Sequence, residues 1–147
     1  MLIHQLSLFV ENRAGQLHEP LKVLAKAGID LRTLALADTK DFGILRLIVS
    51  DWERAKAVLE ADGRVVRVTE VVAIEVPDRP GGLSEILETL AVRQLDIEYM
   101  YAFAPGPTSS AVMVFRFDKP QEAIAALQAA GVNVVGSDEI RRRLGER

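Results

Sequence analysis

Two short segments of the chain combine residue types that could bind a charged small molecule. They are Asn12-Arg13-Ala14-Gly15-Gln16-Leu17 and Asp78-Arg79-Pro80-Gly81-Gly82-Leu83. Glycine lets backbone N–H groups approach a ligand closely, and a helix that starts here offers unpaired donors and a partial positive charge. Such a corner suits a carboxylate or a phosphate, while Asn12 or Asp78 could bind an ammonium group. The alternative is that glycine only forms the turn and that Asn or Asp caps the helix.

These segments belong to a repeat that extends over most of the 147-residue chain. At one constant spacing the matches are Arg13 with Arg79, Gly15 with Gly81, and Leu17 with Leu83. Further along, the spacing is two residues longer and joins Ala55 with Ala123, Leu59 with Leu127, and Gly63 with Gly131. The extra residues are expected within 105–110, because loops absorb insertions at little cost. The chain is therefore predicted to contain two copies of one module.

Each half predicts the same order of elements. Leucines at helical spacing, Leu17, Leu21 and Leu24 in one half and Leu83, Leu87 and Leu90 in the other, predict an amphipathic helix. A second helix is expected to open near Asp51 or Asp118 and to close at Gly63 or Gly131. Strands are expected over 2–10, 31–37, 44–49, 65–68, 71–76, 97–103, 111–117 and 132–135. The order predicts an α+β fold in which both helices of a module cover one face of a four-stranded antiparallel sheet.

The predicted organisation is a first module over 1–70, a second module over 71–140 and a basic C-terminal tail over 141–147. The tail contains Arg141, Arg142 and Arg143, which we expect to be solvated. Modules of this size are marginally stable alone. We therefore expect the two copies to share burial by pairing side by side as a pseudo-dimer.

The pattern (N/D)-R-x-G-x-L between a strand and a helix, present twice in modules of this length, resembles the ACT domain. The resemblance covers about residues 1–137, and EVPDRPGGL followed by DIEYMYAF is similar to small free-standing prokaryotic proteins made of two ACT modules. It implies tandem ferredoxin-like βαββαβ modules. It also implies a regulatory protein that binds a small molecule, commonly an amino acid, at the interface between two modules.

The resemblance also implies which positions contact the ligand. These are the loop residues together with the start of the second strand, which is Asp30 in one half and Asp96 in the other. With side-by-side pairing, the first loop would face Asp96 and the second loop would face Asp30. Acids at these positions favour an ammonium group and discourage a carboxylate unless backbone donors dominate. If only one pocket binds, we favour the second loop, because its two glycines would expose more backbone.

Tyr99 and Tyr101 alternate along the second strand of the second half and therefore share one sheet face. Two interpretations are open. Either both tyrosines are large core residues, balanced by the small residues Thr33 and Ala35 at the equivalent positions of the first half, or they line the pocket. With them, the predicted ligand-binding set is Asn12, Arg13, Ala14, Gly15, Gln16, Leu17, Asp30, Asp78, Arg79, Pro80, Gly81, Gly82, Leu83, Asp96, Tyr99 and Tyr101.

Composition excludes several classes of function. The net charge of −3 argues against nucleic acid or an anionic membrane surface as a partner. The chain has no cysteine, which excludes disulfides, thiolate nucleophiles and cysteine-based metal sites. No signal peptide is recognisable at the N-terminus, and no apolar run approaches the ~20 residues of a membrane helix. We expect a cytoplasmic protein without a cofactor or metal.

An enzyme is not expected, because His4 and His18 are the only histidines and no His–acid–Ser arrangement is in register. Acylphosphatases share the topology, and Asn12 and Arg13 are similar to part of their first loop, but the surrounding motif is absent. A protein-interaction scaffold with vestigial pockets is the other alternative. The third strands carry apolar residues on both faces, so we expect a homodimer or an unidentified target protein to cover the second face.

Overall fold

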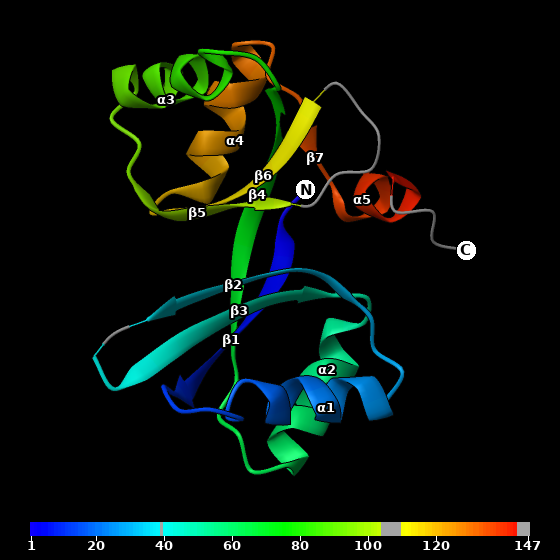
Figure 1. Ribbon diagram of the computed structural model, residues 1–147. Helices are drawn as coiled ribbons and strands as arrows, with labels where there is room; N and C mark the ends of the chain where they lie inside the picture. The colour runs from blue at the N-terminus through cyan, green and yellow to red at the C-terminus, as the bar shows by residue number, and fades with distance from the viewer. Residues whose placement is uncertain (39, 104–109, 144–147) are drawn as a thin grey trace. The chain divides into compact units, whose positions relative to one another are not determined.

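The computed structural model describes residues 1–38, 40–103 and 110–143 (Figure 1). The chain divides into two compact units. The first unit is His4–Thr69, and the second unit combines Met1–Ile3 with Glu70–Arg147. Each unit has its own hydrophobic core.

The first unit contains the elements β1 (Ile3–Glu11), α1 (His18–Lys26), β2 (Leu31–Asp38), β3 (Phe42–Val49) and α2 (Trp52–Ala61). Strand β3 pairs antiparallel with both β2 and β1, and β4 (Arg67–Pro77) follows β1 in the strand order. Alternate residues of β1 and β3 pack against both helices; among them are Leu6, Leu8, Leu45, Leu47, Leu24 and Leu59. Helix α2 starts where Asp51 accepts a hydrogen bond from the Arg54 N–H at 3.1 Å.

The second unit contains most of β4, then α3 (Gly82–Val92), β5 (Ile97–Phe103), β6 (Ser110–Phe117), α4 (Pro120–Ala129), β7 (Val134–Val135) and α5 (Ser137–Arg143). Its strands are antiparallel and have the order β7-β4-β6-β5. The core lies between this sheet and helices α3 and α4 and includes Val72, Ile74, Phe115, Ile86, Leu90 and Leu127. The predicted α+β class, with antiparallel strands and a helix pair on one face in each half, is confirmed.

The elements differ from the sequence prediction in the link between the halves. The strands expected over 65–68 and 71–76 form the single strand β4. The intervening residues include no Gly or Pro, and the segment is rich in Val, so nothing interrupts the extended backbone. Strand β4 begins in the first unit and ends in the second, and it therefore joins the two repeats directly.

The basic run near the C-terminus also differs from the prediction. Arg141–Arg143 form the last turn of α5 rather than a tail outside the fold, and of the three only Arg143 is half-buried, whereas Arg141 and Arg142 are exposed to solvent as expected. Ile140 of this helix is buried, and Arg143 forms an ion pair with Glu75 of β4. Figure 1 shows α5 beside β7, apart from α3 and α4.

The face of the second sheet that turns away from α3 and α4 is apolar and largely buried. Ala73 pairs with both Val114 and Val135 on this face, and all three are buried. Glu75 lies on the same face, because its neighbours Ile74 and Val76 point into the core. The ion pair with Glu75 therefore holds α5 against this side. The apolar second face that we expected a partner to cover belongs to the third strands, β3 and β6, and its coverage by a partner stays a prediction.

Candidate functional site

The two predicted loops lie at equivalent places, between β1 and α1 and between β4 and α3. Gly15 and Gly81 have φ angles of 85° and 86°, in the left-handed region that favours glycine. The carbonyl of Gly15 accepts a hydrogen bond from the Glu19 N–H, and that of Gly81 accepts one from the Glu85 N–H. Both glycines thus form the turn into the following helix.

The second glycine of the second loop is required for close packing. A Cβ on Gly82 would lie 2.1 Å from the carbonyl oxygen of Pro77. The Gly82 N–H donates to the Arg79 carbonyl at 3.0 Å, so this donor is not exposed for a ligand as we had expected. Gly82 instead lets α3 begin directly against the end of β4. The equivalent residue of the first loop is Gln16, and α1 begins later, at His18.

The arginine of each loop binds a carboxylate of its own unit. Arg79 makes two hydrogen bonds to Glu85, Nη1 to Oε1 at 3.0 Å and Nη2 to Oε2 at 2.8 Å. The hydrogen bond and charge of Arg79 lower the pKa of Glu85 below its usual value. The first-loop Arg13 pairs with Glu11 instead. The Arg79 and Glu85 side chains are 53% and 59% exposed, so a ligand could rearrange this pair at little cost.

A cavity of about 420 Å³ in the second unit borders the second loop, and its volume is within the range of small-molecule sites. The walls come from α3, from the ends of β4 and β6, and from the segment that leads into β7. The lining residues are Glu75, Pro77, Gly82, Glu85, Ile86, Thr89, Ser110, Ala130, Gly131, Val132 and Asn133. We call this space the α3 cavity.

The lining of the α3 cavity combines apolar surface with oriented polar groups. Ile86 and Val132 contribute the apolar surface. Asn133 Nδ2 donates to Glu75 Oε2 at 2.8 Å. This hydrogen bond, followed by the interactions with Arg143, lowers the pKa of Glu75 although burial opposes the shift. Glu75 is therefore ionised at neutral pH and can accept hydrogen bonds from a cation.

The start of α3 supplies donors next to this carboxylate. No side chain of the described residues caps the helix. The N–H of Gly82 binds Arg79 and that of Glu85 binds Gly81. Helix geometry leaves the N–H groups of Leu83 and Ser84 without intrahelical acceptors. The cavity thus has a carboxylate in its wall and a helix N-terminus at its edge, an arrangement that can bind both charged groups of an amino acid.

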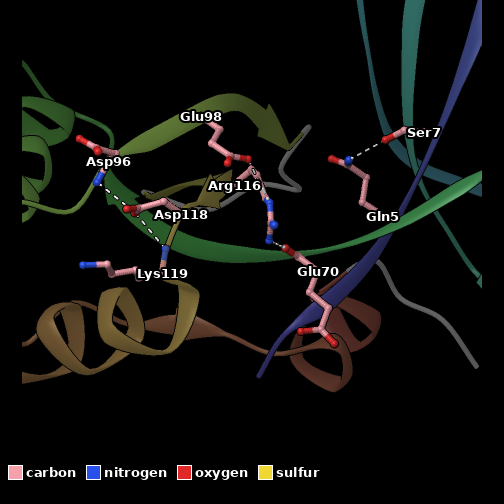
Figure 2. Close-up of polar contacts among 8 residues, drawn as sticks. All are labelled: Gln5, Ser7, Glu70, Asp96, Glu98, Arg116, Asp118 and Lys119. Atoms are coloured by element: carbon pink, nitrogen blue, oxygen red, sulfur yellow. Dashed lines mark hydrogen bonds and ion pairs between the residues drawn. The ribbon is translucent and has the colours of Figure 1, made fainter.

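The other predicted residues do not line this cavity. Asp30 and Asp96 precede β2 and β5, where hydrogen bonds tie each to the residue that follows the third strand of its unit, Ser50 or Asp118. The Asp96 N–H donates to Asp118 Oδ1 at 3.2 Å, and the Asp96 carbonyl accepts from the Asp118 N–H at 3.3 Å (Figure 2). The Asp30 carboxylate pairs with Arg32 at 2.6 Å.

Tyr99 and Tyr101 are half-buried and stack with their ring centroids 6.5 Å apart. Their cross-strand partners are Arg116 and Val114, which place both rings on the sheet face opposite α3 and α4. Arg116 is held there by Glu98 and by the carbonyl oxygen of Glu70 (Figure 2).

Sequence reasoning missed most of the cavity lining. Glu85 and Thr89 are four residues apart, and this spacing places them on one face of α3. Thr89 Oγ1 donates to the Glu85 carbonyl at 3.1 Å. Glu75 and Asn133 are far apart in sequence, and no local pattern brings them together. Gly82 alone of the predicted residues is among the lining that the structure describes.

Neither a metal site nor a membrane span is found in the described ranges. No group of three or more His, Asp or Glu side chains there is arranged to hold a metal ion. None of the helices described is long and apolar enough to cross a membrane.

Comparison with known proteins gives both a family and a fold. The family model of the ACT domain pair matches residues 1–143. A crystal structure of a Bacteroides thetaiotaomicron protein is 38% identical, with a TM-score of 0.88, and the match covers 95% of this chain and 96% of that chain. No curated protein matches the sequence.

Two solved structures of lower identity show the same fold. One is the ligand-free regulatory subunit of aspartate kinase from Thermus thermophilus, at 19% identity and a TM-score of 0.64, covering 88% of this chain and 92% of that chain. The other is aspartate kinase from Synechocystis, at 23% identity and a TM-score of 0.59. That match covers 90% of this chain and 26% of the kinase.

Proposed function

Because the chain belongs to the ACT domain pair family, we propose that it is a regulatory protein that binds an amino acid, and that it is not an enzyme. The α3 cavity carries this proposal, because it lies beside the loop in which the family motif occurs. Its volume suits a ligand of this size. We place the protein in the cytoplasm, as its lack of cysteine suggests, and propose an unidentified target protein as the recipient of its signal.

The proposed binding mode uses three parts of the cavity. The carboxylate of the amino acid lies against the start of α3 at Gly82, where the N-terminal partial positive charge of the helix favours an anion. The ammonium group binds the ionised carboxylate of Glu75. The side chain of the ligand packs against Ile86 and Val132. Opposite charges at the two ends would fix the orientation of the ligand.

Thermal unfolding in the presence of individual amino acids tests the proposed function. An amino acid at 100 times its Kd stabilises the protein by about 2.7 kcal/mol, which for a chain of this length raises Tm by roughly 5–10 °C. We expect at least one of the twenty amino acids to produce such a shift. A flat result across the panel would exclude amino-acid binding and would favour the interaction scaffold.

Thr89→Phe tests whether the α3 cavity is the binding site. The aromatic ring would occupy part of the cavity and narrow the space for a ligand, so the amino acid that stabilises the wild type should no longer raise Tm. Val23→Phe is the matched control, because Val23 is the equivalent residue of α1 and does not line this cavity. The control should keep the full shift. Retention of the shift by Thr89→Phe would place the binding site elsewhere.

A further inference from the structure

The carboxylate of Glu75 connects the α3 cavity to helix α5. One oxygen, Oε2, accepts the hydrogen bond from Asn133, which also lines the cavity. The other oxygen, Oε1, lies 2.5 Å from Nη2 of Arg143, near the C-terminal end of α5. A single side chain therefore contacts both the proposed ligand site and an element outside that site.

The ion pair between Glu75 and Arg143 is more shielded from solvent than the ion pairs that the two loop arginines form. The side chains of Arg143 and Glu75 are only 24% and 26% exposed. Arg79 and Glu85 are both more than half exposed. Because a shielded pair is screened less by water and salt, losing it has a larger effect on the element that it holds.

Helix α5 depends on such contacts with the rest of the unit. It has seven residues, from Ser137 to Arg143, and helices this short are not stable in isolation. Among the contacts of α5 that the structure describes are the buried side chain of Ile140 and the ion pair of Arg143 with Glu75, while Glu139 pairs with arginines of the same helix. A modest change at Glu75 can therefore shift α5 between a docked and a released state.

We infer that α5 reports occupancy of the α3 cavity, because the ammonium group of a bound amino acid competes with Arg143 for the carboxylate of Glu75 and releases the helix. This inference rests on the proposed function and adds the signal that ligand binding produces. Release would expose Ile140 and Arg143 beside Arg141 and Arg142, which are already exposed in the docked helix, and a target could recognise this segment.

Competition acts in both directions: if ligand binding weakens the docking of α5 through Arg143, the docking of α5 weakens ligand binding by the same factor. Arg143→Gln removes the competitor for Glu75, and ligand should then bind more tightly. Arg141→Gln is the matched control, since it makes the same change of charge on the same helix but removes an exposed pair with Asp138.

The first measurement is hydrogen–deuterium exchange of the wild-type amides at 140–143, with and without an equimolar mixture of the twenty amino acids at about 1 mM each. The Ile140 N–H is bonded to the Gly136 carbonyl at 3.1 Å in the docked helix, so release should accelerate its exchange. We expect faster exchange at 140–143 and slower exchange in α3 when the mixture is present. Unchanged or slower exchange in α5, with a raised Tm, would overturn the inference and leave the proposed function intact.

The second measurement is the concentration of the same mixture that gives half of the maximal thermal shift. Arg143→Gln should lower this concentration by about fivefold or more, and Arg141→Gln should leave it unchanged. Equal values for the two variants would overturn the competition. A wild-type Tm that does not respond to the mixture would overturn the proposed function, and the inference with it.

Discussion

The adjacent glycines of the second loop illustrate how residues of one type can be required for different reasons. Gly81 adopts a positive φ in open space, whereas Gly82 has ordinary backbone angles but no room for a side chain. The sequence suggested a common role in exposing the backbone to a ligand. The close approach of Gly82 to Pro77 shows that the second glycine sets the position of α3 relative to β4.

We predict that Gly82→Ala destabilises the protein more than Gly15→Ala. A methyl group on Gly15 meets no atom within 4 Å, so its cost is the backbone strain of about 1 kcal/mol. A methyl group on Gly82 collides with backbone, and overpacking of this kind costs about 1–3 kcal/mol or more. Urea denaturation of the two variants measures the difference. Equal losses would show that α3 can move away from Pro77 freely.

At the scale of elements, the second unit is distinguished by the segment after its last strand. Strand β7 has only two residues and pairs with Ala73 and Ile74. The chain then turns into α5, whose Arg143 reaches back to Glu75 on the same strand as these partners. Because β7 pairs with only two residues of β4 and the chain then folds back as α5, Glu75 of β4 can contact both the α3 cavity and α5.

Acidification should undock α5. The pKa of Glu75 is lowered in the folded protein, first by Asn133 and then by Arg143, while Glu139 and burial act in the opposite direction. A lowered pKa contributes stability above the ordinary value of 4.5, and this contribution is lost as the pH falls through the folded value. The unfolding free energy of the wild type should therefore approach that of Glu75→Gln below pH 4.5.

The comparison with Glu75→Gln isolates this one carboxylate. Glu85 also has a lowered pKa, but it is present in both proteins and its contribution cancels. Glu139 shares Arg143 with Glu75, so both proteins also carry Glu139→Gln in this comparison. Urea denaturation at a series of pH values gives the difference between the two proteins. A difference that stays constant through this pH range would contradict the proposed contribution of Glu75.

For the whole molecule, the homodimer expected from the sequence stays a prediction. Phe9 and Phe42 of the first unit are 69% and 47% exposed, which is unusual for aromatic side chains on a sheet. Sedimentation velocity at micromolar concentration should give a mass twice that of the chain. A single species with the mass of one chain would refute the prediction and would leave these aromatic residues on a monomer surface.

The sequence predicted the repeat and its elements well for identifiable reasons. Leucines at helical spacing in each half correspond to buried faces of α1 and α3, as Leu24 and Leu90 show. Glycines of the motif coincide with left-handed turns at Gly15 and Gly81. These features depend on local backbone geometry and on periodic burial, and both can be recognised within a few residues.

The site was predicted less completely, since its residues come from separate segments. The loop motif located the N-terminus of α3 and one lining residue, Gly82. Glu75, Ser110 and Asn133 line the same cavity because β4, β6 and the approach to β7 converge there. Their types are common on protein surfaces, and nothing in their local sequence marks them as neighbours.

By itself, therefore, the sequence determined the duplication, the α+β class, the family resemblance and the turn that starts each first helix. Only the tertiary structure decided that the basic C-terminal residues form a helix docked on Glu75, and that the second loop borders a cavity. The physical reason is the distance along the sequence over which each interaction acts. Periodicity and turn chemistry act over a few neighbouring residues, whereas a cavity and an ion pair such as Glu75–Arg143 exist only after distant strands and helices have packed together.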